Sequence, residues 1–175
     1  MKKRVSVMAV LSLMVFSVTR LSAQIGFTAG TEYGLGGIVR AGSYPMMVEF
    51  AAGLAPTFVF VTVLGGDDII KIYLPYTIGG KLSFAVTDKD NPNRFGIKGG
   101  ISYSGLLRLG FGGGGDLIVS KSPDIVLSAC LMIFPAARKA IVDQINADEG
   151  THHPEAWLQG GLMEVQPQLS ISVIF

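Results

Sequence analysis

Large apolar and small polar residues alternate along most of this chain with a period of two. From Ile70 to Val86 one parity carries large apolar side chains, and the other carries small or charged ones. Because successive side chains of a strand point to opposite faces, this pattern predicts strands with one apolar and one polar face. The same alternation recurs in Ile25 to Gly34, Val48 to Ala55, Phe95 to Ser104 and Leu107 to Ser120.

Charged residues in these stretches obey the same parity. The small, polar face holds seven of them, Glu32, Glu49, Lys71, Lys81, Lys98, Arg108 and Asp116. That face is otherwise mostly Gly, Ser and Ala, whereas a water-facing strand is rich in Lys, Glu and Thr. A charge facing lipid near the bilayer midplane would cost about 2–4 kcal/mol. We therefore predict a barrel with its apolar face toward lipid and these seven charges inside.

The last strand-like stretch, residues 169–175, ends on an aromatic residue. Its hydroxyl residues Ser170 and Ser172 share one face. The opposite, apolar face consists of Leu169, Ile171, Val173 and Phe175. A final strand of this kind is typical of an outer-membrane barrel, in which it closes the barrel against lipid.

Turn sequences separate the predicted strands. Gly65 to Asp68, Asp88 to Asn93 and Lys121 to Asp124 are short and polar. Pro135 to Gly161 is longer, and Ala136 to Ala147 within it predicts a short amphipathic helix. Because outer-membrane barrels have short periplasmic turns and longer external loops, this segment is predicted to be the last external loop.

The strand boundaries between Leu35 and Gly66 stay open at this stage, because Pro45 and Pro56 interrupt the pattern. The best fit to the whole pattern is about eight strands, with about ten as an alternative. The predicted fold is all-β: an antiparallel transmembrane β-barrel with a short helix in the last external loop.

The N-terminus has the features of a secretory signal peptide for Sec export. Lys2, Lys3 and Arg4 precede the apolar run from Val5 to Val18, and Ala23 supplies a small residue for cleavage. The run is shorter than the about 20 residues of a membrane-spanning helix, although an uncleaved anchor helix is the alternative. We predict a signal peptide at 1–23 and a barrel domain at 24–175.

Composition fits a membrane protein without spanning helices. Hydrophobic residues make up 49% of the chain and charged residues 15%, against about 25% charged in soluble domains. Four of the 14 basic residues lie in 1–23, which leaves 10 bases against 13 acids. That balance gives no basic face for nucleic acid. Cys130 is the one cysteine; we predict a small apolar packing residue, with a reactive or intermolecular thiol as the alternative.

Candidate chemistry is sparse. Gly110 to Gly115 matches G-x-G-x-x-G, but a strand-like stretch follows where a nucleotide site needs a helix. His152 and His153 lie in one loop without a recognisable Ser partner, so a solvated loop is favoured over a weak metal contact. Trp157 and Leu158 are candidates for a contact with the membrane interface or an external partner. We predict no catalytic residue, no cofactor and no metal.

Several segments resemble a known family. They are Ile72 to Lys81, Phe95 to Tyr103, Gly110 to Asp116 and Lys121 to Asp124. With the signal peptide and terminal Phe175, they resemble the small outer-membrane β-barrel proteins, the OmpA/OmpX-like or PorT-like group. The resemblance implies insertion by the barrel-assembly machinery, which in this family reads the C-terminal strand, and it implies no particular activity.

The functional prediction is an integral outer-membrane barrel with a plugged interior, since eight strands leave room only for side chains. Its role would be structural, or binding and adhesion through external loops. The barrel would be surrounded by outer-membrane lipid. It would bind no nucleic acid, and its external partner is not specified by the sequence. Two alternatives stay open: a soluble periplasmic lipid-binding barrel, and a lipid-modifying outer-membrane enzyme.

Overall fold

The computed structural model describes residues 22–63, 69–91, 93–120, 122–160 and 164–175. The predicted signal peptide lies outside them, apart from Ser22 and Ala23, which are the first two residues of strand β1. The predicted turn at 65–68 also lies outside the described residues.

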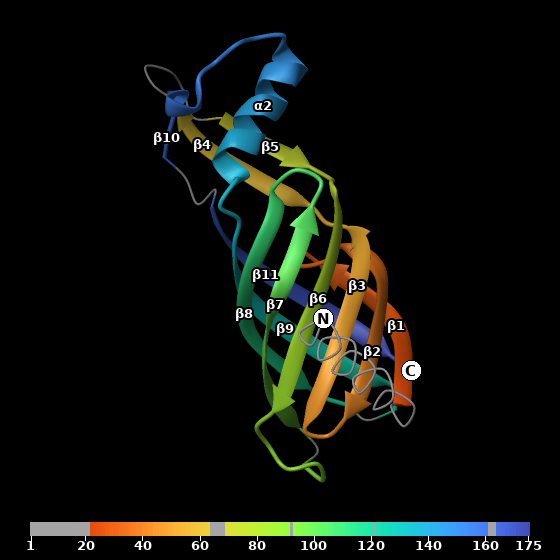
Figure 1. The fold of residues 1–175 in the computed structure, drawn as a ribbon. Coiled ribbons are helices and arrows are strands. Elements are labelled where there is room, and N and C mark those ends of the chain that lie inside the picture. The colour runs from red at the N-terminus through yellow and green to blue at the C-terminus, as the bar shows by residue number, and fades with distance from the viewer. Residues whose placement is uncertain (1–21, 64–68, 92, 121, 161–163) are drawn as a thin grey trace, which may run out of the picture.

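Eight antiparallel strands close into a barrel (Figure 1). They are β1 (Ser22–Gly30), β2 (Leu35–Ser43), β3 (Met46–Leu54), β6 (Tyr76–Ala85), β7 (Arg94–Ser104), β8 (Arg108–Ile118), β9 (Asp124–Ile133) and β11 (Val165–Ile174). The first and last strands pair to close it, with Phe27 opposite Val173. The predicted eight-stranded antiparallel barrel is confirmed.

Prolines mark the ends of strands in the region that the sequence pattern left open. Pro45 lies in the turn between β2 and β3, and Pro56 lies between β3 and β4 (Thr57–Val63). Pro75 likewise separates β5 (Ile69–Tyr73) from β6. Because proline has no N–H to donate to a ladder, each of these residues falls in a gap between paired segments.

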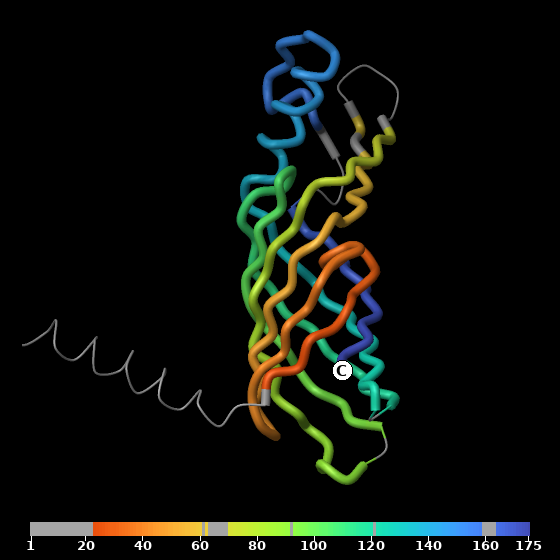
Figure 2. The backbone as a smooth tube through the Cα atoms, turned by 90° about the vertical axis from the view of Figure 1, so that its right-hand side faces the viewer, coloured from red at the N-terminus to blue at the C-terminus, as the bar shows by residue number. Residues whose placement is uncertain are grey.

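An extension rises beyond one end of the barrel (Figures 1 and 2). It contains helix α2 (Ala137–Glu149) and a small sheet in the order β10 (Leu158–Gly160), β4, β5. The helix ends at Gly150, whose φ of 67° is the left-handed conformation common at helix C-termini. The predicted short helix between the last two barrel strands is confirmed. Within the described residues, no helix has both the length and the apolar character to cross a membrane.

The two ends of the barrel differ. The helix end adjoins α2, while the turn end carries the β2–β3, β6–β7 and β8–β9 connections together with the start of β1 and the end of β11. An apolar group of buried side chains, the helix-end cluster, covers the helix end. Its members are Val59, Leu106, Leu107, Met132, Phe134, Ala137, Ile141, Val142, Ile145 and Leu158. Side chains therefore fill the barrel at this end.

Large apolar side chains cover the outside of the barrel. Each barrel strand contributes at least two exposed ones, and one from each strand is Phe27, Val39, Phe50, Ile78, Ile101, Phe111, Leu131 and Ile171. Among the charged residues of the barrel strands, which are all described, Arg108 alone is exposed. The usual arrangement of a soluble domain, with apolar residues inside and charges outside, is inverted here.

Candidate functional site

Six charged side chains meet inside the barrel. They come from the β1–β2 connection and from five different strands, and each is 6% exposed or less. Three are anionic and three are cationic: Glu32, Glu49, Asp116, Arg40, Lys81 and Lys98. The charges therefore balance within the barrel. We refer to this group as the interior ionic network.

Lys98 joins the acids of the interior ionic network. Its ammonium group lies 2.9 Å from Asp116 and 3.1 Å from Glu32. A third carboxylate, that of Glu49, lies 3.7 Å away. The guanidinium of Arg40 lies 2.7 Å from Glu49 and 3.4 Å from Asp116. Such shared pairing offsets the large cost of removing charges from water.

Hydroxyl groups add hydrogen bonds to two of the acids. Ser170 donates a hydrogen bond of 2.6 Å to Glu32, and Ser128 donates one of 2.6 Å to Asp116. The ammonium of Lys81 also pairs with Glu32. Glu32 thus binds groups from β6, β7 and β11, although it belongs to the connection between β1 and β2.

Glycines on the inner face leave space for the larger side chains. A Cβ atom on Gly79 would lie 2.7 Å from the ring of Tyr33, and one on Gly100 would lie 2.8 Å from Cγ of Lys81. The Tyr33 ring in turn lies 5.0 Å below the Lys81 ammonium, within reach of a cation–π contact. The glycine-rich polar face therefore gives room to buried charges.

The structure brings together five of the seven predicted interior charges. Lys71 and Arg108 do not join them, and the prediction is wrong for both. Lys71 is on β5, beyond the closed barrel, so its side chain turns toward α2 and lies 2.6 Å from Glu149. Arg108 is exposed, and its Nη1 lies 3.4 Å from the hydroxyl of Tyr103.

The backbone conformation of Arg108 explains why its side chain lies on the unexpected face. Its φ of 71° is the left-handed conformation, which interrupts the alternation of side chains where β8 begins. The preceding Leu107, assigned to the outer face from the pattern, is 3% exposed within the helix-end cluster instead. From Leu109 onward the predicted parity holds, with Leu109 and Phe111 exposed.

Arg40 is the charge that the sequence analysis missed. It lies on β2, in the region where the prolines obscured the strands. Its inward neighbour Ile38 is apolar, so β2 lacks a clean polar face. The outer face of β2 could have revealed it. Leu35 and Val39 are large, exposed and odd-numbered, so the even-numbered Arg40 belongs to the inner face.

The predicted assembly residues lie on β11 and just after it. Leu169, Ile171 and Phe175 are exposed on the outer face, and Val173 is partly exposed. Since β11 pairs with both β9 and β1, its outer face is continuous with the faces of the strands on either side.

Other residues singled out in the sequence lie in packed or hydrogen-bonded parts of the structure. His153 stacks on Trp157 at a centroid distance of 3.9 Å, and the described residues contain no group of three or more potential metal ligands. Leu158 is 1% exposed, so its predicted role in an external contact is wrong. Cys130 is buried beside charged groups, with its sulfur 3.6 Å from the Lys81 ammonium, in place of the predicted apolar surroundings. Residues 110–115 lie within β8.

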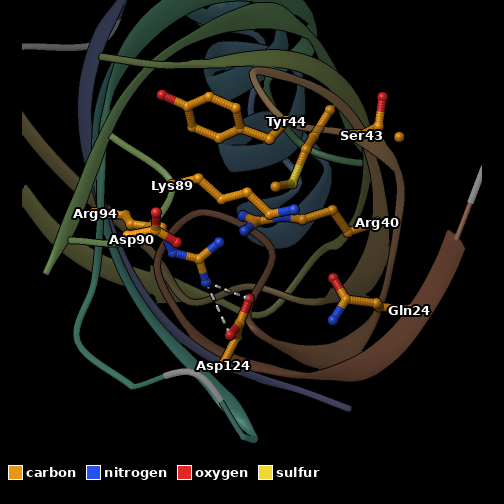
Figure 3. Close-up of a pocket in the computed structure, with 10 residues that line it drawn as sticks. Gln24, Arg40, Ser43, Tyr44, Lys89, Asp90, Arg94 and Asp124 are labelled. Atoms are coloured by element: carbon orange, nitrogen blue, oxygen red, sulfur yellow. Dashed lines mark hydrogen bonds and ion pairs between the residues drawn. The ribbon is translucent and has the colours of Figure 1, made fainter. Parts of the chain in front are cut away.

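A polar pocket of about 430 Å³ lies at the turn end (Figure 3). Arg40 of the interior ionic network contributes to its wall, together with Arg94, Lys89, Asp90 and Asp124. Arg94 donates to both carboxylate oxygens of Asp124, at 3.1 and 3.2 Å. The helix end is packed with apolar side chains, whereas the turn end has a charged recess.

Comparison of the chain with protein-family models, with curated proteins and with solved structures found no match. The features of the barrel that bear on function are its apolar outer face, its interior ionic network and the recess at the turn end.

Proposed function

We propose that the protein is an integral outer-membrane β-barrel with a closed interior, serving as an envelope component or as a scaffold for external binding segments. The observation that carries the proposal is the inverted surface. Apolar side chains cover the barrel on the outside, and the six charges of the interior ionic network are buried within it, as is Asp124. Burying apolar area contributes about 25 cal/mol per Å², a gain that this face obtains only in lipid or against a partner.

The height of the apolar outer surface is consistent with insertion of the barrel into a bilayer. From Phe95 to Tyr103 along β7, a tilted strand rises roughly 20 Å. Near its upper limit, the ring centroids of Tyr76 and Tyr103 are 6.0 Å apart, with exposed Arg108 beside Tyr103. Tyrosines gather at membrane interfaces, and the apolar band of such barrels is about 25 Å tall. We take this group as the external limit of the bilayer.

The lengths of the connections support an orientation. The turn end carries short connections, whereas the helix end carries the extension built from β4, β5, α2 and β10. Because outer-membrane barrels have short periplasmic turns and long external loops, the helix end faces outside in this proposal. The external position of the α2 segment is part of this proposal.

A soluble lipid-binding barrel is supported less well. Such a protein needs an apolar chamber for an acyl chain, and here the interior ionic network occupies the barrel. We also propose that the barrel is non-catalytic, because its buried acids and bases are engaged with one another. The external extension would then carry any binding or adhesion role.

Fractionation of the native host tests the proposal. The protein should remain in the membrane pellet after carbonate extraction and should migrate differently on gels before and after boiling. Recovery in the soluble periplasmic fraction, without a heat-dependent shift, would contradict it.

A further inference from the structure

Two arginines that line the pocket at the turn end each have a buried Nε without a hydrogen-bond acceptor among the described residues. Arg40 donates through Nη2 to Glu49, while its Nε has no hydrogen-bond partner among the described residues. Arg94 uses Nη2 for Asp124, and its buried Nε likewise lacks a partner among them. The side chain of Arg40 is 2% exposed. Each guanidinium therefore keeps hydrogen-bonding capacity beyond the carboxylate that it binds, and the buried atoms without partners in the same region also include an acceptor, Oε1 of Glu49.

Cationic side chains from separate parts of the barrel converge on this pocket. Arg40 comes from β2, Arg94 from the start of β7, and Lys89 from the β6–β7 connection. Figure 3 shows all three reaching into the same space. Asp90 and Asp124 line it as well, so the wall carries three cations and two anions.

We propose that this pocket binds a small molecule bearing a phosphate group. A tetrahedral oxyanion offers several acceptors to guanidinium N–H groups and an ammonium, a combination that gives strong charge-assisted hydrogen bonds. The volume of about 430 Å³ leaves space for a group attached to the phosphate. The phosphate ester enters from the turn end, because the helix-end cluster closes the other end.

The proposal goes beyond the membrane assignment and does not depend on it. The pocket lies at the turn end of the barrel and would exist equally in a soluble barrel. Failure of phosphate binding would leave the membrane assignment intact, and failure of the membrane assignment would leave the pocket intact.

Titration calorimetry of the full chain in an uncharged detergent tests the site with three probes: inorganic phosphate, glycerol 3-phosphate and phosphatidylglycerol in mixed micelles. Saturable binding of glycerol 3-phosphate assigns a free phosphate ester, and saturable binding of inorganic phosphate alone assigns the free phosphate ion. Binding of the phospholipid alone assigns a lipid headgroup. Absence of saturable binding by all three overturns the proposal.

Substitutions in and away from the pocket test whether the phosphate binds there. Arg94→Gln should weaken binding by about tenfold, because a charge-assisted donor is lost. Asp124→Asn should strengthen it, because the carboxylate that competes for Arg94 is neutralised. Arg138→Gln removes the same charge at the other end of the molecule, where Arg138 pairs with Glu164, and should change nothing.

Folding of each variant is checked by its heat-dependent gel shift. Lys89→Ala, at an exposed position, gives a second test of the pocket and should also weaken binding. Phosphate binding that is the same in Arg94→Gln, Lys89→Ala and the native chain would overturn the proposal.

Discussion

Lys81 and Glu32 form a buried ion pair inside the barrel, although 49 residues separate them in the chain. The pair links β6 to the connection between β1 and β2, where Glu32 folds inward after β1 ends. Lys98 and Ser170 bind the same carboxylate. A side chain from near the start of the barrel is thus held by strands from its middle and its end.

Removing one partner of this pair should destabilise the barrel. Lys81→Met leaves Glu32 with fewer compensating partners in a dry interior, and we expect a loss of about 3 kcal/mol in the free energy of unfolding. The double variant Lys81→Met, Glu32→Gln should lose less than the two single variants together, because the stranded charge is also removed. Urea unfolding in lipid vesicles, followed by circular dichroism, measures both. Strictly additive losses would mean that the two side chains do not interact.

Substitutions at two exposed isoleucines test where the proposed lipid-facing surface ends. Ile101 on β7 and Ile72 on β5 are 59% and 67% exposed, but Ile72 lies beyond the bilayer limit inferred from Tyr76 and Tyr103. Ile101→Lys should therefore impair membrane insertion by about 2–4 kcal/mol, and Ile72→Lys should be much milder. Heat-modifiable protein in the membrane fraction is the readout. A soluble barrel would tolerate both substitutions equally.

The extension should respond to alkaline pH through Tyr73. Burial, followed by the hydrogen bond and the charge of Asp148, raises the pKa of the Tyr73 phenol from 10.0 to about 12. A raised folded-state pKa means that this stabilisation is intact below pH 10 and is lost as the pH rises toward 12. Comparison with Tyr73→Phe by phenolate absorbance and by protease sensitivity of the α2 segment checks this. An ordinary pKa for Tyr73, or identical pH profiles for the two proteins, would contradict the contact.

The two-residue period was enough to predict the barrel and five of its interior charges, because strand parity is a local property. The period gave the wrong position for two charges, because it does not show where a strand is interrupted or where barrel pairing ends. A left-handed residue at Arg108 interrupts the alternation, and the end of barrel pairing places Lys71 outside.

Long-range contacts were also beyond the sequence pattern. Leu158 was predicted to be an exposed loop residue, but it is buried in the helix-end cluster, which also contains Val59 and residues of α2. Arg40 was hidden by an apolar inward neighbour, Ile38. The pocket at the turn end is assembled from β2, β7 and the β6–β7 connection, and no single stretch of sequence contains it.

Tryptophan quenching by brominated acyl chains tests whether the outer face of the barrel meets lipid. The chain has one tryptophan, Trp157, which lies in the extension and serves as the reference in the native protein. A single reporter is then placed by Ile101→Trp in a Trp157→Phe background. In vesicles of brominated phospholipid, we predict strong quenching of the reporter at position 101 and little quenching of Trp157. Equally weak quenching at both positions would contradict the membrane assignment.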